Sequence, residues 1–169
     1  MSMIAHLSKP EYVHVLLNPL PVYGLAVGVL GLIIALLLRT RAARVTALAL
    51  VMVSAASAWP VYHYGEAGYD RVKAMVDEAG DKWLEEHTRR GEQLIYVFYV
   101  VAALSALAII AELVVPKAAV LIAIATLIVA AGNLCVGGYI AYAGGRIRHK
   151  EFRFEAPPER EITTPDAPT

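Results

Sequence analysis

The stretch LIYVFYVVAALSALAIIAELVV, from Leu94 to Val115, decides the fold of this chain. One acid, Glu112, interrupts a run long enough to cross the hydrocarbon core of a bilayer, which takes about 20 helical residues. Backbone amides in hydrocarbon need partners within their own segment, so the expected conformation is an α-helix. Hydrophobic residues make up 58% of the 169-residue chain, against roughly 45–50% in soluble domains. The sequence therefore predicts an integral membrane protein.

Three more runs meet the same criterion. They cover about 20–38, 45–62 and 118–143. Only a few residues connect run 20–38 to run 45–62, and fewer still connect Val115 to run 118–143. The helices joined by such short connections must be antiparallel neighbours. We therefore expect an all-α membrane protein, an up-down-up-down bundle of four transmembrane helices within residues 1–148. A polar, Pro-rich tail follows at 149–169.

The segment 65–93 between the second and third spans is polar but periodic. Its apolar positions recur every three or four residues, at Tyr69, Val72, Val76, Ala79, Trp83 and His87. Such spacing is typical of one face of an amphipathic helix. We expect this helix to lie across the end of the bundle.

Histidine and aromatic residues share one end of the predicted bundle. The five histidines are His6, His14, His63, His87 and His149. All tyrosine, tryptophan and phenylalanine residues map to the same membrane face in this topology. Ordinary aromatic belts form at both interfaces, so anchoring alone does not account for the asymmetry.

Imidazole is a common ligand of haem iron, and its titration near neutrality suits proton exchange with a quinone. The candidate ligands are His14, His63 and His87. Trp59, Tyr96 and Tyr99 are the candidate aromatic walls of a haem b or quinone site. The alternative is that these side chains are interfacial anchors with hydrated polar tips. His6 and His149 lie in flanking segments, where we expect them to be solvated.

Two polar residues fall inside the predicted spans. Glu112 lies near the end of its span, where it can snorkel or pair with Arg41 or Arg44 across the bundle. Asn133 would be costly without a partner in lipid, so we expect it to hydrogen-bond to another helix.

The composition excludes several function classes. Basic and acidic residues cancel, so no net field favours nucleic acid. The single cysteine, Cys135, rules out a disulfide framework. No nucleophile motif, phosphate-binding glycine loop or zinc motif occurs, so independent enzymatic activity is not expected.

The leading hypothesis is an accessory membrane subunit of an electron-transfer or respiratory-type complex, with a haem b or quinone site at the histidine-rich end. The alternative is a purely structural subunit that docks on a larger membrane complex without a cofactor. A transporter finds little support, because there is no inverted repeat and no pair of broken helices.

The run HVLLNPLPVYGLAVGVLGL, from His14 to Leu32, resembles the opening of the bacterial four-span proteins of domain-of-unknown-function family 2231. Its histidine and the proline seven positions later stand at His14 and Pro21, and GGYIAYAGGRIR closes the fourth helix. The sequence departs from the family pattern at Pro19, Tyr139 and Ala143. Family members often have histidine, glutamate and histidine at these three positions, respectively.

This resemblance implies a four-helix bundle of the bacterial inner membrane, often found near electron-transfer proteins, and no established activity. Orientation follows from the positive-inside rule. Arg39, Arg41 and Arg44 behind the first span place the termini and the 63–93 loop in the periplasm. Counting the basic residues of every loop gives the reverse orientation.

Overall fold

The computed structural model describes residues 6–159, and every regular element in that range is helical. The all-α fold class is therefore confirmed. In chain order the helices are α1 (Pro10–Leu17), a π-helix (Leu20–Gly24), α2 (Leu25–Leu38), α3 (Arg41–Ala56), α4 (Ala58–Lys73), α5 (Glu78–Val114), α6 (Pro116–Arg148) and a 3₁₀-helix (Lys150–Phe152).

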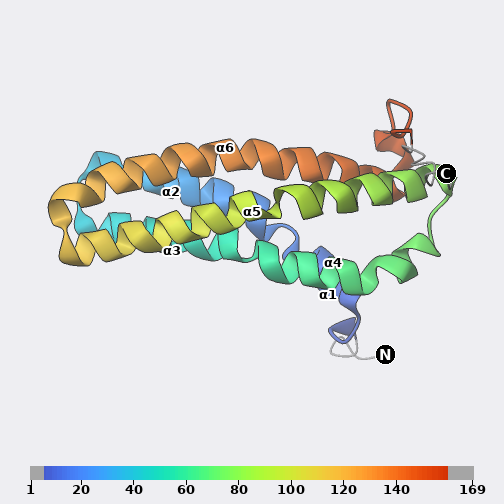
Figure 1. Ribbon diagram of the computed structural model, residues 1–169, viewed down its shortest axis with the longest axis horizontal. Coiled ribbons are helices and arrows are strands. Elements are labelled where there is room, and N and C mark those ends of the chain that lie inside the picture. Colours follow the sequence, from blue (N-terminus) through green and yellow to red (C-terminus); the bar gives the residue numbers. More distant parts are fainter. Residues whose placement is uncertain (1–5, 160–169) are drawn as a thin grey trace, which may run out of the picture.

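Four helical stretches are long and apolar enough to cross a membrane. They are Pro10–Leu38, Arg41–Lys73, Glu78–Val114 and Pro116–Arg148. Figure 1 shows them lying side by side and reversing direction at each turn. The 37 residues of α5 extend about 55 Å at 1.5 Å per residue, well beyond a hydrocarbon core of about 30 Å. The helices therefore continue past the bilayer.

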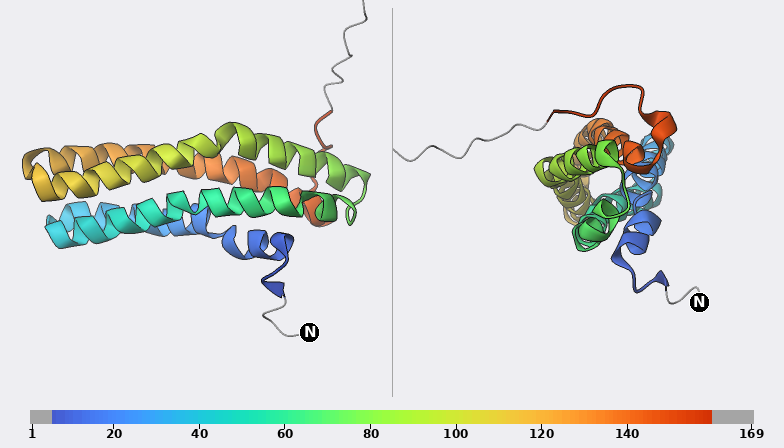
Figure 2. Two further views of the ribbon diagram at one scale, coloured as in Figure 1. Left: turned by 60° about the horizontal axis from the view of Figure 1, so that its bottom comes forward. Right: turned by 90° about the vertical axis from the view of Figure 1, so that its right-hand side faces the viewer.

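The first of these stretches is bent where two prolines fall close together. Pro19 and Pro21 carry no N–H, so the regular hydrogen-bond ladder cannot continue through them. A π-helical turn takes over, in which the Gly24 N–H donates to the Pro19 carbonyl. Figure 2 shows that α1 is offset from the line of α2 as a result. α1 packs against α4, whereas α2 packs against α3.

The second stretch is interrupted at Ser57, where α3 has ended and α4 begins. Pro60 has no N–H to donate to the carbonyl of Ala56, one turn before it. At the same break the Ser57 hydroxyl donates to the Ser54 carbonyl (2.6 Å). The helix that we expected to end near residue 62 continues as α4 to Lys73.

The segment 65–93 differs from the expectation of one helix across the bundle end. It is a hairpin, in which the end of α4 and the start of α5 prolong the second and third spans. Asp77 is extended and its carboxylate accepts the Gly80 N–H, which starts α5 afresh. Four of the six predicted apolar positions do share one buried cluster, because Tyr69, Val72 and Val76 pack against Trp83 across the turn. Periodicity located the buried face but could not show that the chain reverses.

We call α2, α3 and the adjoining residues 101–114 and 116–133 the closed half, because they enclose one continuous apolar core. Glu112 is buried there and pairs with Arg44, whose Nη2 donates to Oε2 at 2.9 Å. This confirms one of the two expected partners. Asn133 is 1% exposed, and neither end of its amide has a hydrogen-bond partner among the described residues. The expected interhelical hydrogen bond is therefore absent from the described part of the chain.

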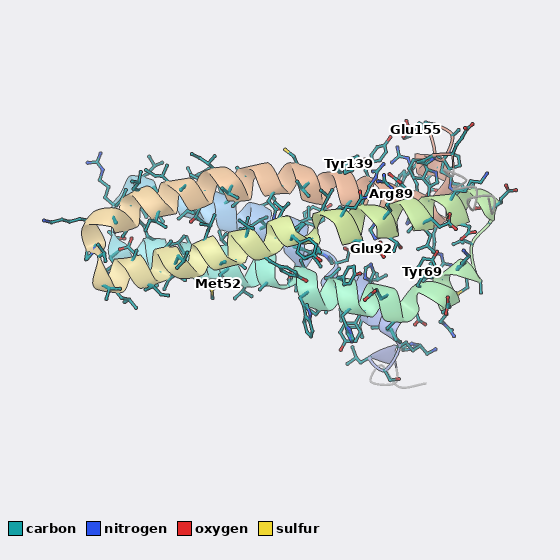
Figure 3. All side chains as sticks on the ribbon, viewed as in Figure 1. Met52, Tyr69, Arg89, Glu92, Tyr139 and Glu155 are labelled. Atoms are coloured by element: carbon teal, nitrogen blue, oxygen red, sulfur yellow. The ribbon has the colours of Figure 1, made fainter. Side chains whose placement is uncertain are left out.

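The other half, which we call the cavity half, comprises α1, α4 and the adjoining residues 78–98 and 137–148. Figure 3 shows oxygen and nitrogen atoms crowding this half, around Tyr69, Arg89 and Glu155, while the half with Met52 is mostly carbon. The described chain starts and ends in the cavity half (Figure 1).

The first part of the expected tail folds back on the bundle. Arg153 donates to the carbonyls of Arg146 and Ile147, both at 2.8 Å, and so satisfies the free end of α6. It also pairs with Asp77 at the start of α5. Residues 160–169 of the expected tail lie outside the described range.

Candidate functional site

A cavity of about 750 Å³ opens between two pairs of helices in the cavity half. One wall is α1 with α4 and the other is α5 with α6; within each pair the helices pack together, whereas α4 and α5 contact each other little. Val22, Phe98 and Gly137 line its inner end, and Met75 and Ile147 line its outer end. The volume lies within the roughly 300–1,000 Å³ typical of cofactor sites.

His14 reaches this cavity from α1. Its Nδ1 lies 2.8 Å from the backbone carbonyl oxygen of Val61 on α4. A Cβ on Gly65 would lie 2.9 Å from the same nitrogen, closer than nonbonded atoms normally approach. Gly65 therefore provides the space in which the ring sits, one turn beyond the carbonyl that orients it.

His87 repeats this arrangement on the opposite wall. Its Nδ1 lies 3.0 Å from the carbonyl oxygen of Ile140 on α6. A Cβ on Gly144, one turn further along α6, would lie 3.0 Å from two atoms of the ring. Each histidine thus belongs to one helix of a pair and is held by a carbonyl and a glycine of the other helix.

The two imidazoles face the same space. Their ring centroids are 6.2 Å apart and their planes are almost perpendicular, at 84°. A carbonyl oxygen can only accept, so Nδ1 is the donor in each ring, and in a neutral imidazole Nε2 then keeps its lone pair. This is the tautomer of a metal-binding histidine whose other nitrogen is held by a second-shell acceptor.

The spacing suits one metal ion between the rings. With metal–nitrogen bonds of about 2 Å on opposite sides of the ion, two imidazole centroids come to lie about 6 Å apart. Among the described residues, no group of three or more His, Cys, Asp or Glu side chains gathers as a metal site. A bare zinc ion usually takes three or four protein ligands. Two histidines alone fit a haem, in which the porphyrin provides the other four nitrogens.

His63, Trp59, Tyr96 and Tyr99 do not join this pair. His63 is exposed and stacks on Trp59, with centroids 5.7 Å apart and planes 8° from parallel. Tyr96 packs edge-on against Tyr99, and Trp59 and Tyr96 are 61% and 67% exposed. None of the four side chains lines the cavity described here. Their positions suit anchoring at the membrane interface.

The outer histidines also stay apart from the cavity. His6 packs near Tyr12, and His149 lies 3.0 Å from Glu151 at the end of α6. His149 is exposed and His6 is half-buried, and the solvated role expected for both stays a prediction.

Charged residues surround the outer part of the cavity. Glu66 and Asp70 on α4 and Glu92 on α5 line it, as do Arg89 and Arg148. Arg89 is held by the Glu86 carboxylate through two hydrogen bonds of 2.8 and 2.7 Å. Beyond the outer end, Lys150 and the Gly80 N–H, together with Arg153, hold the pKa of the Asp77 carboxyl well below its usual value.

Sequence reasoning named the two histidines but missed what orients them. The Val61 and Ile140 carbonyls have no side-chain signal, because any residue provides one. The glycines had a partial signal, because a glycine inside a helical pattern often has a packing or functional reason. Gly65 stands alone in such a pattern, and Gly144 is the first of the pair Gly144–Gly145.

Comparison with family models, curated proteins and solved structures found no match to this chain. Function is therefore inferred from the geometry of the site.

Proposed function

We propose that this protein is an integral membrane subunit of an electron-transfer complex, and that His14 and His87 would hold a haem b in the cavity. The observation that carries the proposal is the pair of imidazoles, 6.2 Å apart across the cavity, each held through Nδ1 by a backbone carbonyl.

The two-wall construction suits a flat cofactor. One ligand comes from the α1–α4 wall and the other from the α5–α6 wall. A planar group inserted between the walls would meet one imidazole on each face. When bound, the iron of a haem carries one electron at a time between its ferric and ferrous states. Two histidine ligands leave no open coordination position, which favours electron transfer over oxygen chemistry.

A quinone is the second candidate for the same cavity, and the histidines alone do not provide the donors that it needs; other lining groups, such as Tyr64, Thr88 or Arg148, would have to donate. A neutral quinone carbonyl needs a donor. Both Nδ1–H groups are already committed to backbone carbonyls, and a neutral Nε2 only accepts. A purely structural subunit that docks on a larger complex stays the alternative without a cofactor. In that alternative the two imidazoles only join the helices of each pair through their bonds to Val61 and Ile140.

We also propose that the chain resides in the bacterial inner membrane with the cavity half on the periplasmic side. Arg39, Arg41 and Arg44 cluster at the far turn of the closed half and support this orientation. Accessibility of a single cysteine introduced at Glu66 to a membrane-impermeant reagent in intact cells, in a Cys135→Ser background, tests it. Labelling only after lysis would reverse the orientation.

The test of cofactor binding is a reduced-minus-oxidised visible spectrum of the detergent-purified protein, with haem quantified as the pyridine haemochrome. We expect a b-type signal near one haem per chain. His14→Ala and His87→Ala should each abolish or strongly reduce it. His63→Ala is the matched control and should leave it unchanged.

A colourless protein that releases quinone on solvent extraction would favour the quinone instead. A colourless protein without quinone would favour the structural subunit. A haem signal that survives both His14→Ala and His87→Ala would place the cofactor elsewhere.

A further inference from the structure

The two ends of the cavity differ in character. The inner end is apolar, with Val22, Ile95 and Phe98 in its lining. The outer end adjoins a second cavity of about 410 Å³, with which it shares Met75, Ile147 and Arg148. Lys150 and Arg153 also line this second cavity, against a single acid, Asp77. The second cavity is therefore positively charged, whereas acids outnumber bases in the lining of the first, where Glu66, Asp70 and Glu92 are among them.

Most of the basic groups that line the two cavities already have acceptors. Arg89 is bound by Glu86 and by the Gln93 side chain. Lys150 and Arg153 both pair with Asp77, at 3.0 and 2.9 Å. Arg148 lines both cavities, and no hydrogen bond or ion pair joins it to any described residue.

Arg148 is also well placed relative to the histidine pair. It follows Gly144, against which the His87 ring sits, by four residues on α6. One helical turn advances about 5.4 Å along the axis, which puts the root of this long side chain one turn outward from the imidazole. A flat ligand centred between the imidazoles would extend towards Arg148 with one edge and towards Phe98 with the other.

We infer that the cavity takes an amphipathic planar ligand with an anionic edge, and that Arg148 anchors this edge. The inference rests on the proposed function: in haem b the anionic edge is the pair of propionate carboxylates, and the opposite edge is hydrocarbon. Guanidinium and carboxylate groups form charge-assisted hydrogen bonds, the stronger class of such bonds. Arg148 is thus a positioning residue, which fixes which way round the ligand sits.

The experiment compares haem b with its dimethyl ester, which has the same ring and iron but no carboxylate charge. Protein stripped of haem is reconstituted with each, and the rate of transfer to haem-free myoglobin is measured. Arg148→Ala should release haem b about tenfold faster than the wild type, as expected for the loss of one charge-assisted hydrogen bond. The ester should leave wild type and variant at the same rate.

Two further variants control for folding and charge. Arg41→Ala removes an exposed arginine at the far turn of the closed half and should not change either rate. Arg148→Lys should release haem b more slowly than Arg148→Ala but faster than the wild type, because lysine keeps the charge but cannot form a bidentate hydrogen bond.

The outcomes separate the two proposals. Equal release of haem b from wild type and Arg148→Ala, with His14- and His87-dependent binding intact, would overturn the role of Arg148 alone. Equal acceleration of haem b and ester would also overturn it, because the variant would then act on the fold. Failure of the wild type to bind either compound would overturn the haem proposal itself, and the anchor with it.

Discussion

The closed half and the cavity half use the same small residues for different purposes. In the closed half, Gly28 lets α2 approach the backbone of α3, where an added Cβ would lie 3.1 Å from the Val51 nitrogen. In the cavity half, Gly65 and Gly144 make room for imidazole rings rather than for a neighbouring helix. The comparison teaches that a glycine in a membrane helix marks a close approach, and that its neighbours decide whether a helix or a functional side chain fills the space.

The two halves also differ in how they satisfy polar groups. Each half holds a buried ion pair, Glu112–Arg44 in the closed half and Glu86–Arg90 in the cavity half. The cavity half in addition directs histidine nitrogens to backbone carbonyls. The ion pairs are complete in themselves. The histidine contacts leave one nitrogen of each ring free to bind.

The largest effect on stability is expected from breaking the ion pair of the closed half. Glu112→Ala leaves the largely buried Arg44 without its carboxylate, which typically costs about 3–5 kcal/mol. The thermal midpoint of this variant in detergent should fall markedly. Glu66→Ala is the control at an exposed site in the cavity half, and it should change the midpoint little. An unchanged midpoint in Glu112→Ala would show that the closed half does not depend on this pair.

A second comparison tests Gly65 and Gly144, the glycines against which the two histidine rings pack. Gly65→Ala and Gly144→Ala each place a methyl group about 3 Å from a histidine ring, so the ring must shift and its bond to the carbonyl must weaken. We expect each variant to bind haem b about tenfold more weakly. The measurement is titration of the stripped protein.

Gly138→Ala is the matched control, because Gly138 does not line the cavity and an added Cβ there meets no atom within 4 Å. It should bind haem as the wild type does and be more stable by about 0.5–1 kcal/mol, as alanine favours the helix. Equal binding by all three variants would contradict the role given to Gly65 and Gly144.

The sequence predicted the membrane fold well, because a bilayer imposes a length on each span and the charges fall between the spans. It named His14 and His87, yet it grouped His63 with them. The helical period shows which positions share a face but not which of several helix ends meet across a space. The bend at Pro19 and Pro21 determines which helix ends lie opposite each other. It places α1 against α4, so that His14 lies opposite His87.

Local patterns also could not separate a helix lying across the bundle from a hairpin that prolongs it. Both have the same period, and the deciding feature is the Asp77 cap of α5. The pairs Glu78–Lys82 and Glu86–Arg90 form on α5, whereas Glu85 turns to Lys73 across the hairpin. That last contact depends on a chain reversal that residue spacing does not reveal.

A smaller effect is expected at Asn133, in the core of the closed half. Its amide is buried without a hydrogen-bond partner among the described residues, and an unsatisfied buried polar group costs about 1–3 kcal/mol. Asn133→Leu should therefore raise the free energy of unfolding by about 1 kcal/mol, measured by denaturant titration in mixed micelles. A loss of stability would instead indicate a bound water that the asparagine holds.

The smallest effect concerns the contact that closes the outer end of the cavity half. The pKa of Asp77 is lowered by Lys150, the Gly80 N–H and Arg153. Its stabilising contribution is therefore fully present above the ordinary value of 3.8 and is lost as the pH falls through the lowered value.

The thermal midpoints of wild type and Asp77→Asn should thus differ by a constant amount from pH 7 to about 4. The difference should shrink below that range. A difference that already disappears between pH 7 and 5 would contradict the lowered pKa.

The most direct test of the central claim is low-temperature electron paramagnetic resonance of the ferric protein. The account predicts a low-spin haem with two imidazole ligands, and a strongly anisotropic signal because the rings of His14 and His87 lie 84° apart. Replacing either histidine, but not His63, should remove this signal. A high-spin signal in the wild type, or a low-spin signal unchanged in His14→Ala and His87→Ala, would contradict it.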